Sequence, residues 1–155
     1  MQDVSIQQSF DDLKKEIGLL RQSVLKYQNK PFKVGKIYTS DELEIYDALS
    51  FRFMKTIDLA LSFFRSLERY VDAKESETLR DRLLFIQKLR IVDDINFWFE
   101  ARELRGKIAH TYLPRELKDI YEEIHKKTKT VDRCIIRLEK YLGELHGTNK
   151  PLFNG

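Results

Sequence analysis

The sequence predicts an all-α protein, an up-and-down bundle of about five helices. Apolar residues recur every three or four positions over long stretches, and no stretch alternates with the two-residue period of a strand. Only six glycines and three prolines interrupt 155 residues, which is typical of a helical domain. Short connections between long amphipathic helices favour antiparallel neighbours. We expect one domain over 1–145 and a flexible C-terminal tail over 146–155, which holds two glycines and a proline.

The first two helices are expected to be long. The first is predicted from a cap at Ser9 to Asn29, where a lysine and a proline follow. Its apolar residues form one stripe: Phe10, Leu13, Ile17, Leu20, Val24 and Tyr27. The second is predicted over 40–74, roughly 45–50 Å at 1.5 Å per residue, and Thr39 to Glu42 has the pattern of a capping box. Its stripe is Tyr46, Leu49, Phe53, Ile57, Ala60, Phe64, Leu67 and Val71.

Further apolar residues widen the surface of this second helix. Phe51, Leu61 and Phe63 lie outside the single stripe. We therefore expect the helix to be central in the bundle, or to pack against a second subunit as well.

Three more helices are expected in the second half of the chain. A short one begins at Ser76 and runs through Leu79, Leu83, Ile86 and Leu89. The next is capped by Asp93 and runs from 94 to about 109. The proline at 114 then breaks the pattern, and a last helix runs from Arg115 to Leu145. Its stripe is Leu117, Tyr121, Ile124, Thr128, Val131, Ile135, Leu138, Leu142 and Leu145.

The predicted fourth helix has a core stripe and a flank that carries basic residues. At about 100° per residue, the core stripe is Phe97, Ala101, Leu104 and Ile108. The flank holds Trp98, Arg102 and Arg105. We expect a used surface on this flank.

Composition narrows the environment and the partners. The net charge of +3 and the sequence pI of about 8.9 are compatible with a nucleic-acid partner without requiring one. A single cysteine, Cys134, forms no internal disulfide, and the first residues lack a basic leader. No apolar run approaches the ~20 residues of a membrane span. We expect a cytoplasmic protein that is not in a membrane.

The histidines do not predict a metal site. His110, His125 and His146 are the only three, and none has another histidine or a cysteine at ligand spacing. The sequence therefore predicts neither a metal nor another cofactor.

One stretch carries chemistry: Arg105, His110 and Tyr112 follow one another where the fourth helix is expected to end. The residues at 101, 102, 108 and 109 are Ala, Arg, Ile and Ala, so Arg105 has no acidic partner one turn away. It must bond elsewhere in the fold, in a partner subunit or to an anionic ligand. On a regular helix His110 points roughly 160° from Arg105. The two share a site only if the helix unwinds near Ala109 or if two copies meet.

An arginine and a histidine suffice for metal-free RNA cleavage. Histidine moves a proton from the ribose 2′-hydroxyl, or to the leaving oxygen, near neutral pH. Arginine stabilises the charge that develops on the phosphate. Since the ribose supplies the nucleophile, DNA is a poor substrate.

The spacing Arg105-x4-His110-x-Tyr112, at the end of the penultimate helix of a small helical chain, resembles the HEPN family. The segments 94–99 and 48–53 also resemble it, and the likeness covers most of 40–145. The most similar group is the toxins encoded beside a minimal nucleotidyltransferase antitoxin, also called nucleotidyltransferase substrate-binding proteins. Of these residues only the motif is specific.

The resemblance implies a HEPN-like homodimer that acts as a type VII-like ribonuclease toxin. Arg105 and His110 of two copies would form one composite site for RNA. Tyr112 would be the tyrosine to which the cognate nucleotidyltransferase adds AMP, which would block the site.

Alternatives remain open at this point. The family often has asparagine directly after the arginine, and here the residue is Gly106. Asp58 of the second helix is a further candidate to face the site, although a surface carboxylate is the simpler interpretation. The chain is thus an endoribonuclease, a catalytically silent nucleotide-binding or partner-docking subunit, or a structural bundle with a coincidental motif.

Overall fold

The computed structural model describes the backbone of residues 2–154 and the side chains of residues 5–147. Within this range there are five helices and no strand: α1 Gln2–Asn29, α2 Ser40–Asp72, α3 Leu79–Lys88, α4 Ile95–Ile108 and α5 Pro114–Asn154. The predicted all-α bundle is confirmed.

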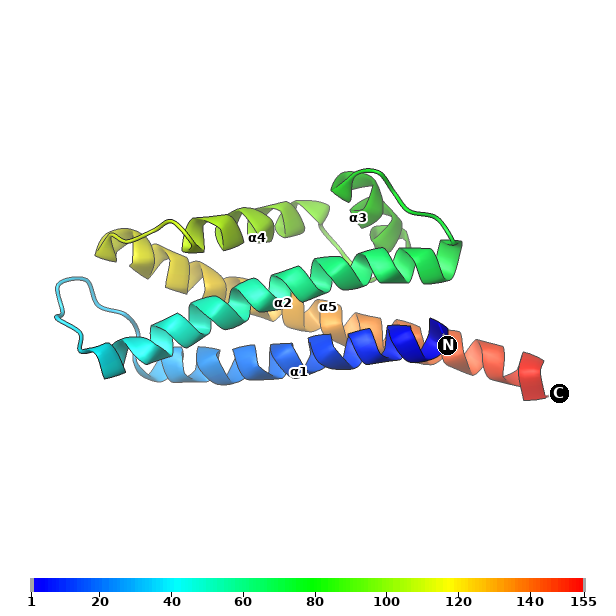
Figure 1. Ribbon diagram of the computed structural model, residues 1–155, viewed down its shortest axis with the longest axis horizontal. Helices are drawn as coiled ribbons and strands as arrows, with labels where there is room; N and C mark the ends of the chain where they lie inside the picture. Colours follow the sequence, from blue (N-terminus) through cyan, green and yellow to red (C-terminus); the bar gives the residue numbers. More distant parts are fainter. Residues whose placement is uncertain (1, 155) are drawn as a thin grey trace.

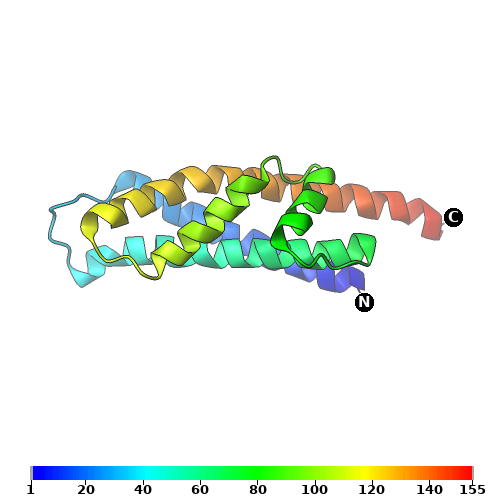
Figure 2. The ribbon, with the colours of Figure 1, turned by 90° about the horizontal axis from the view of Figure 1, so that it is seen from above.

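The helices form an elongated up-and-down bundle. Figure 1 shows α1 antiparallel to α2, and α5 running in the same direction as α2. The two short helices α3 and α4 return the chain from the end of α2 to the start of α5, so together they take the place of one long helix in the bundle. Seen from above, α4 lies over the bundle and crosses from α5 toward α2 (Figure 2). This crossing carries the Arg105 end of α4 onto α2.

The predicted stripes of the long helices face the core. All six residues of the α1 stripe are buried, and Ile6 extends it by one turn. In α2 the stripe is buried from Tyr46 to Leu67, while Val71 is half-buried. In α5 the residues from Tyr121 to Leu142 are buried and the terminal leucines at 117 and 145 are half-buried. Of the residues expected to widen α2, Phe63 is buried, Leu61 is half-buried and Phe51 is exposed.

Several predicted helix starts are wrong by a few residues, for local reasons. α1 begins at Gln2, before the predicted cap at Ser9, because Ile6 continues the buried face. α3 begins at Leu79, since Thr78 is the cap and its side chain accepts a hydrogen bond from the backbone N–H of Asp81. α5 begins at Pro114, a residue whose fixed φ and missing N–H suit the first helical position.

The start of α4 is one residue later than predicted. Asp94 is the cap, and its carboxylate accepts from the backbone N–H of Asn96. The carboxylate of Asp93 is engaged elsewhere, in an ion pair with Arg137 of α5.

The capping box of α2 is confirmed. The Thr39 hydroxyl accepts from the Glu42 backbone N–H at 3.2 Å, and the Glu42 carboxylate accepts from the Thr39 backbone N–H at 3.1 Å. These reciprocal bonds satisfy two donors that a helix start otherwise leaves free.

The last helix is longer than predicted. α5 continues beyond Leu145 to Asn154, because the glycine at 147 only weakens a helix, by roughly 1 kcal/mol relative to alanine. The predicted end of the last helix at Leu145 is therefore wrong, while the division into a domain over 1–145 and a tail over 146–155 stays a prediction. The side chains beyond Gly147, and Gly155 itself, lie outside the described residues, so the flexibility expected there concerns a part that is not described.

Candidate functional site at the end of α4

The motif straddles the end of α4. The helix ends at Ile108, and the backbone N–H of His110 donates to the carbonyl of Lys107 at 3.1 Å. The Thr111 hydroxyl donates to the same carbonyl at 2.7 Å. These two bonds close the helix with a tight turn. Arg105 consequently stands in the last helical turn, while His110 and Tyr112 lie outside the helix.

Arg105 has its partner on α2. Its Nε and Nη2 donate to the two carboxylate oxygens of Asp58 at 3.0 and 2.9 Å, a bidentate pair. The hydrogen bond with Asp58, followed by the charge of that carboxylate, raises the pKa of Arg105. Of the three possibilities open for this guanidinium, the bond elsewhere in the fold is the one the structure shows. It also brings Asp58 to the site.

The Arg105 guanidinium nevertheless stays available to a ligand. The side chains of Arg105 and Asp58 are 43% and 51% exposed, so the pair lies at the surface. A guanidinium has five N–H donors, and Asp58 takes two of them. Three donors, including both on Nη1, remain for an anion.

His110 and Tyr112 are exposed in the segment that follows α4. Tyr112 is 81% exposed, and neither side chain has a hydrogen bond or ion pair with another described residue. In particular, no such bond joins the His110 ring to Arg105 or Asp58. The helix end alone therefore does not join Arg105 to His110 within one chain.

The buried face of α4 is rotated from the prediction. Ile95, Trp98, Ala101 and Leu104 are buried, while Phe97 and Ile108 are half-buried. This face is turned by about 60° toward Trp98, so Arg105 lies on its central line rather than on a flank. The rotation follows from the packing of α4 on α2 as well as α5, with the Trp98 ring edge-on to Phe64 at 5.0 Å.

The expected surface of Trp98, Arg102 and Arg105 is wrong for Trp98, which is only 1% exposed. Arg102 is exposed and lies over the ring of Phe99 at 5.5 Å. Arg105 is partly exposed with Asp58, and the turn that holds His110 and Tyr112 follows it.

Gly106 has room for a side chain. A β-carbon added there meets no heavy atom within 4 Å. The glycine is therefore not required by close packing around its α-carbon.

A hollow of about 380 Å³ lies between the end of α4 and the first turns of α5. Glu116, Asp119 and Glu123 line it together with the single cation Lys107. Three carboxylates repel a phosphate, so this side is a poor site for RNA.

The structure can be searched for a metal site and for a membrane-spanning helix only among the residues that it describes. Among them, no group of three or more His, Cys, Asp or Glu side chains is placed to hold a metal ion. None of the described helices has both the length and the apolar character needed to cross a membrane.

Sequence reasoning missed one further cluster. Arg90, Arg137, Lys140 and Tyr141 line a hollow between the α3–α4 connection and α5. The residues 137, 140, 141 and 144 share one face of α5 by their spacing of three and four, which was a visible signal. The sequence did not indicate that Arg90 lies close to that face of α5, because this depends on how the chain folds.

Comparison with protein-family models, with curated proteins and with solved structures finds no match for this chain. The structure defines the class of the protein as an all-α helical bundle with an exposed arginine–aspartate pair at the end of its fourth helix.

Proposed function

We propose that the chain is a metal-independent endoribonuclease of the HEPN type, active as a homodimer. The observation that carries the proposal is the bidentate Arg105–Asp58 pair, held at the surface directly before the exposed His110 turn. It combines an oriented cation with a free imidazole, two groups that suffice for metal-free RNA cleavage.

The chemistry needs no nucleophile from the protein. The ribose 2′-oxygen attacks the adjacent phosphate, and His110 accepts the 2′-hydroxyl proton. The bond from phosphorus to the 5′-oxygen breaks, and that oxygen takes a proton from the second histidine of the dimer. The free donors of Arg105 stabilise the charge on the phosphate oxygens, while Asp58 fixes the plane of the guanidinium.

Apolar side chains around Asp58 support a second subunit at this face. Phe51, Met54, Asp58 and Leu61 follow one another at spacings of three, four and three, so they share one face of α2. Phe51 is 59% exposed, and Met54 and Leu61 are half-buried. In the dimer this stripe is covered, and the two α4 ends meet across it. Arg105 of one chain then faces His110 of the other.

The proposal includes control through Tyr112. A cognate nucleotidyltransferase binds ATP, and the Tyr112 phenol oxygen attacks its α-phosphate while pyrophosphate leaves and the phenol proton passes to solvent. The exposure of the phenol makes it accessible to such an enzyme. The added phosphate then occupies the donors of Arg105 and excludes RNA. The proposal implies a cytoplasmic protein, since RNA and ATP are found in that compartment.

A second candidate function is a catalytically silent subunit that binds a nucleotide or docks a nucleotidyltransferase. Two observations favour it: Asp58 already neutralises Arg105, and Gly106 offers no side chain to the substrate. The two functions differ in whether RNA is cut.

The deciding experiment measures cleavage of single-stranded RNA in excess chelator. We expect cleavage by the wild-type chain and its loss in Arg105→Ala and His110→Ala. Matched controls are Arg102→Ala on the same helix and His125→Ala on α5, both of which should cleave normally. Binding of RNA or nucleotide without cleavage establishes the silent subunit, and unchanged cleavage in His110→Ala overturns the catalytic assignment.

The modification is tested separately by intact mass. The chain is incubated with ATP and a minimal nucleotidyltransferase encoded beside it. We expect an AMP adduct on wild type and on Tyr141→Phe, and none on Tyr112→Phe. An adduct that persists on Tyr112→Phe removes the role of Tyr112.

A further inference from the structure

The end of α3 places an arginine in a backbone conformation that favours glycine. Arg90 has φ of +63°. Its N–H donates to the Gln87 carbonyl at 2.9 Å, and the Ile91 N–H reaches back to the Ile86 carbonyl at 3.4 Å. This is the Schellman pattern, in which the left-handed position is usually glycine. An arginine at such a strained position points to a use for its side chain.

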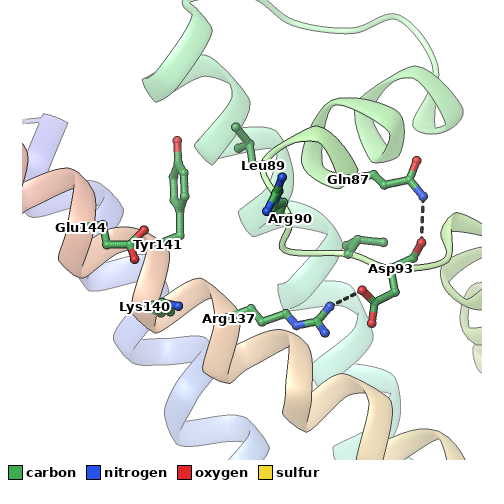
Figure 3. A pocket seen from close by; sticks show the side chains of 9 residues that line it. Gln87, Leu89, Arg90, Asp93, Arg137, Lys140, Tyr141 and Glu144 are labelled. Carbon is green, nitrogen blue, oxygen red and sulfur yellow. Dashed lines mark hydrogen bonds and ion pairs between the residues drawn. The ribbon is translucent and has the colours of Figure 1, made fainter.

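Arg90 lies on the wall of a hollow between the α3–α4 connection and α5. The hollow measures about 670 Å³, within the range of small-ligand sites. Figure 3 shows Arg90 and Leu89 on one side, and Lys140, Tyr141 and Glu144 of α5 on the other.

One wall of the hollow is fixed by internal bonds. Arg137 of α5 forms an ion pair with Asp93, and the Asp93 carbonyl accepts from the Gln87 side chain at 2.8 Å (Figure 3). These bonds tie α5 to the end of α3, so the opening has a defined width. They also neutralise Arg137 and Asp93 against each other.

Two cations of the hollow are not neutralised. Neither Arg90 nor Lys140 has a side-chain hydrogen bond or an ion pair with any described residue. Glu144 is likewise unpaired within that part of the chain. The hollow therefore offers two free cationic donors for an anion and one free carboxylate that accepts a hydrogen bond.

The aromatic ring of Tyr141 adds an apolar surface. The ring stands between Glu144 and Arg90 in Figure 3, and Leu89 and Val92 line the same hollow. Partial burial raises the pKa of Tyr141, so its phenol is protonated at neutral pH and can donate a hydrogen bond. A flat ring beside cations suits a base attached to a phosphate.

We propose that this hollow binds one nucleotide unit. The phosphate lies between Arg90 and Lys140, the base lies against Tyr141, and a hydroxyl or amino group donates to Glu144. Inorganic phosphate alone fits less well, since it meets the charge of Glu144 and leaves the apolar walls uncovered. The site is separate from Arg105 and His110, and its existence does not depend on RNA cleavage.

Titration calorimetry of the full chain with AMP, adenosine and inorganic phosphate tests the proposal. We expect AMP to bind, and adenosine and phosphate to bind at least about tenfold more weakly, because each lacks half of the contacts. Arg90→Gly and Lys140→Gln should each weaken AMP binding about tenfold, the size of one lost charge-assisted hydrogen bond.

The chain offers a matched control for each variant. Ala73 is the other non-glycine residue with positive φ among the described residues, so Ala73→Gly relieves the same backbone strain without removing a cation. Lys129→Gln removes an exposed lysine of α5 that does not line the hollow. Both controls should bind AMP like wild type. Absence of AMP binding, or wild-type affinity for AMP in Arg90→Gly and Lys140→Gln, overturns the proposal.

The source of the nucleotide is decided with a short single-stranded RNA in the His110→Ala background. Tighter binding of RNA than of AMP assigns the hollow to an RNA strand, and weaker binding assigns it to a free nucleotide. In both cases Arg90→Gly must reduce the affinity. If it does not, the binding lies elsewhere and the proposal is wrong.

Discussion

Two arginine–carboxylate pairs join α2 to the short helices α3 and α4, and the two pairs differ in burial. The side chains of Arg82 and Glu68 are 7% and 2% exposed, whereas those of Arg105 and Asp58 are 43% and 51% exposed. The first pair lies between α2 and α3, and the second between α2 and α4. An arginine–carboxylate pair therefore has a different role when it is buried than when it is exposed.

The buried pair is part of the fold. Glu68 accepts from the backbone N–H and the hydroxyl of Ser76, and Arg82 donates to the Ser76 carbonyl at 2.9 Å. The Arg82 Nε lies 3.5 Å from Glu68, within ion-pair distance but not aligned for a hydrogen bond. The cluster closes the α2–α3 connection, and removing one partner leaves a buried charge uncompensated.

The exposed pair contributes little to the fold. Ion pairs in water are worth about 0.2–1 kcal/mol, because solvent screens them and two side chains must be ordered. A bidentate pair at the surface is therefore better explained by the orientation it gives Arg105 than by stability.

The largest expected effect is that of Glu68→Ala. We expect the free energy of unfolding to fall by about 3–5 kcal/mol, since Arg82 remains buried without its partner. Urea unfolding measures it. The control is Glu75→Ala, which removes the exposed partner of Arg69 and should lower the free energy of unfolding much less. Equal losses in the two variants would show that burial does not separate the pairs.

A smaller effect is expected at Ala73, which ends α2 next to the buried cluster. Its φ of +49° places a β-carbon in the left-handed region, and its N–H donates to the Arg69 carbonyl. Ala73→Gly should raise stability by about 1 kcal/mol. Ala73→Gly should give the same gain in a Glu68→Ala background if the backbone strain at Ala73 is independent of the Arg82–Glu68 ion pair. A loss of the gain there would show that the buried pair enforces the turn.

A still smaller change in stability is expected for Arg105→Ala by urea unfolding, because solvent screens an exposed ion pair. The same variant should lower RNA cleavage by about 10²–10³-fold, the usual loss for a group that stabilises transition-state charge. Asp58→Asn should lower cleavage less, since it loosens the guanidinium without removing it. A destabilisation of Arg105→Ala as large as that of Glu68→Ala would assign this arginine to the fold instead.

These two pairs also show what the sequence could and could not predict. The stripes of α1, α2 and α5 were predictable because a helix of many turns averages its periodic signal over many residues. The buried face of α4 was not, since a helix of 14 residues that crosses two neighbours is oriented by them. Trp98 was therefore placed at the surface although it is buried.

The candidate site was predictable mainly along the chain, although Asp58 of the second helix was one candidate to face it, and it does bond to Arg105. The sequence predicted Arg105, His110 and Tyr112 at a helix end, and the helix does end at Ile108. It showed that Arg105 lacks a partner on its own helix, but Asp58 is 47 residues away. Pairing over that separation depends on where α4 crosses α2. The predicted homodimer and the composite site remain proposals.

The smallest expected effect concerns a third ion pair, which is exposed but fixed by a helix cap. The hydrogen bond from Lys36, followed by those from Thr39, lowers the pKa of Glu42 from 4.5 to about 2. Because the folded pKa is the lower one, this contribution to stability is present above the ordinary pKa and is lost as pH falls toward about 2.

Urea unfolding at two pH values measures this loss. Between about pH 5 and about pH 2.5, the urea midpoint should fall further for wild type than for Glu42→Gln. Glutamine keeps an acceptor for the Thr39 N–H without a titrating charge, so it isolates the contribution of Lys36, which lies 2.9 Å from Glu42. Identical pH dependence in the two proteins would mean that the cap alone orders this end of α2, and that an exposed charge adds nothing even when its partner is held in place.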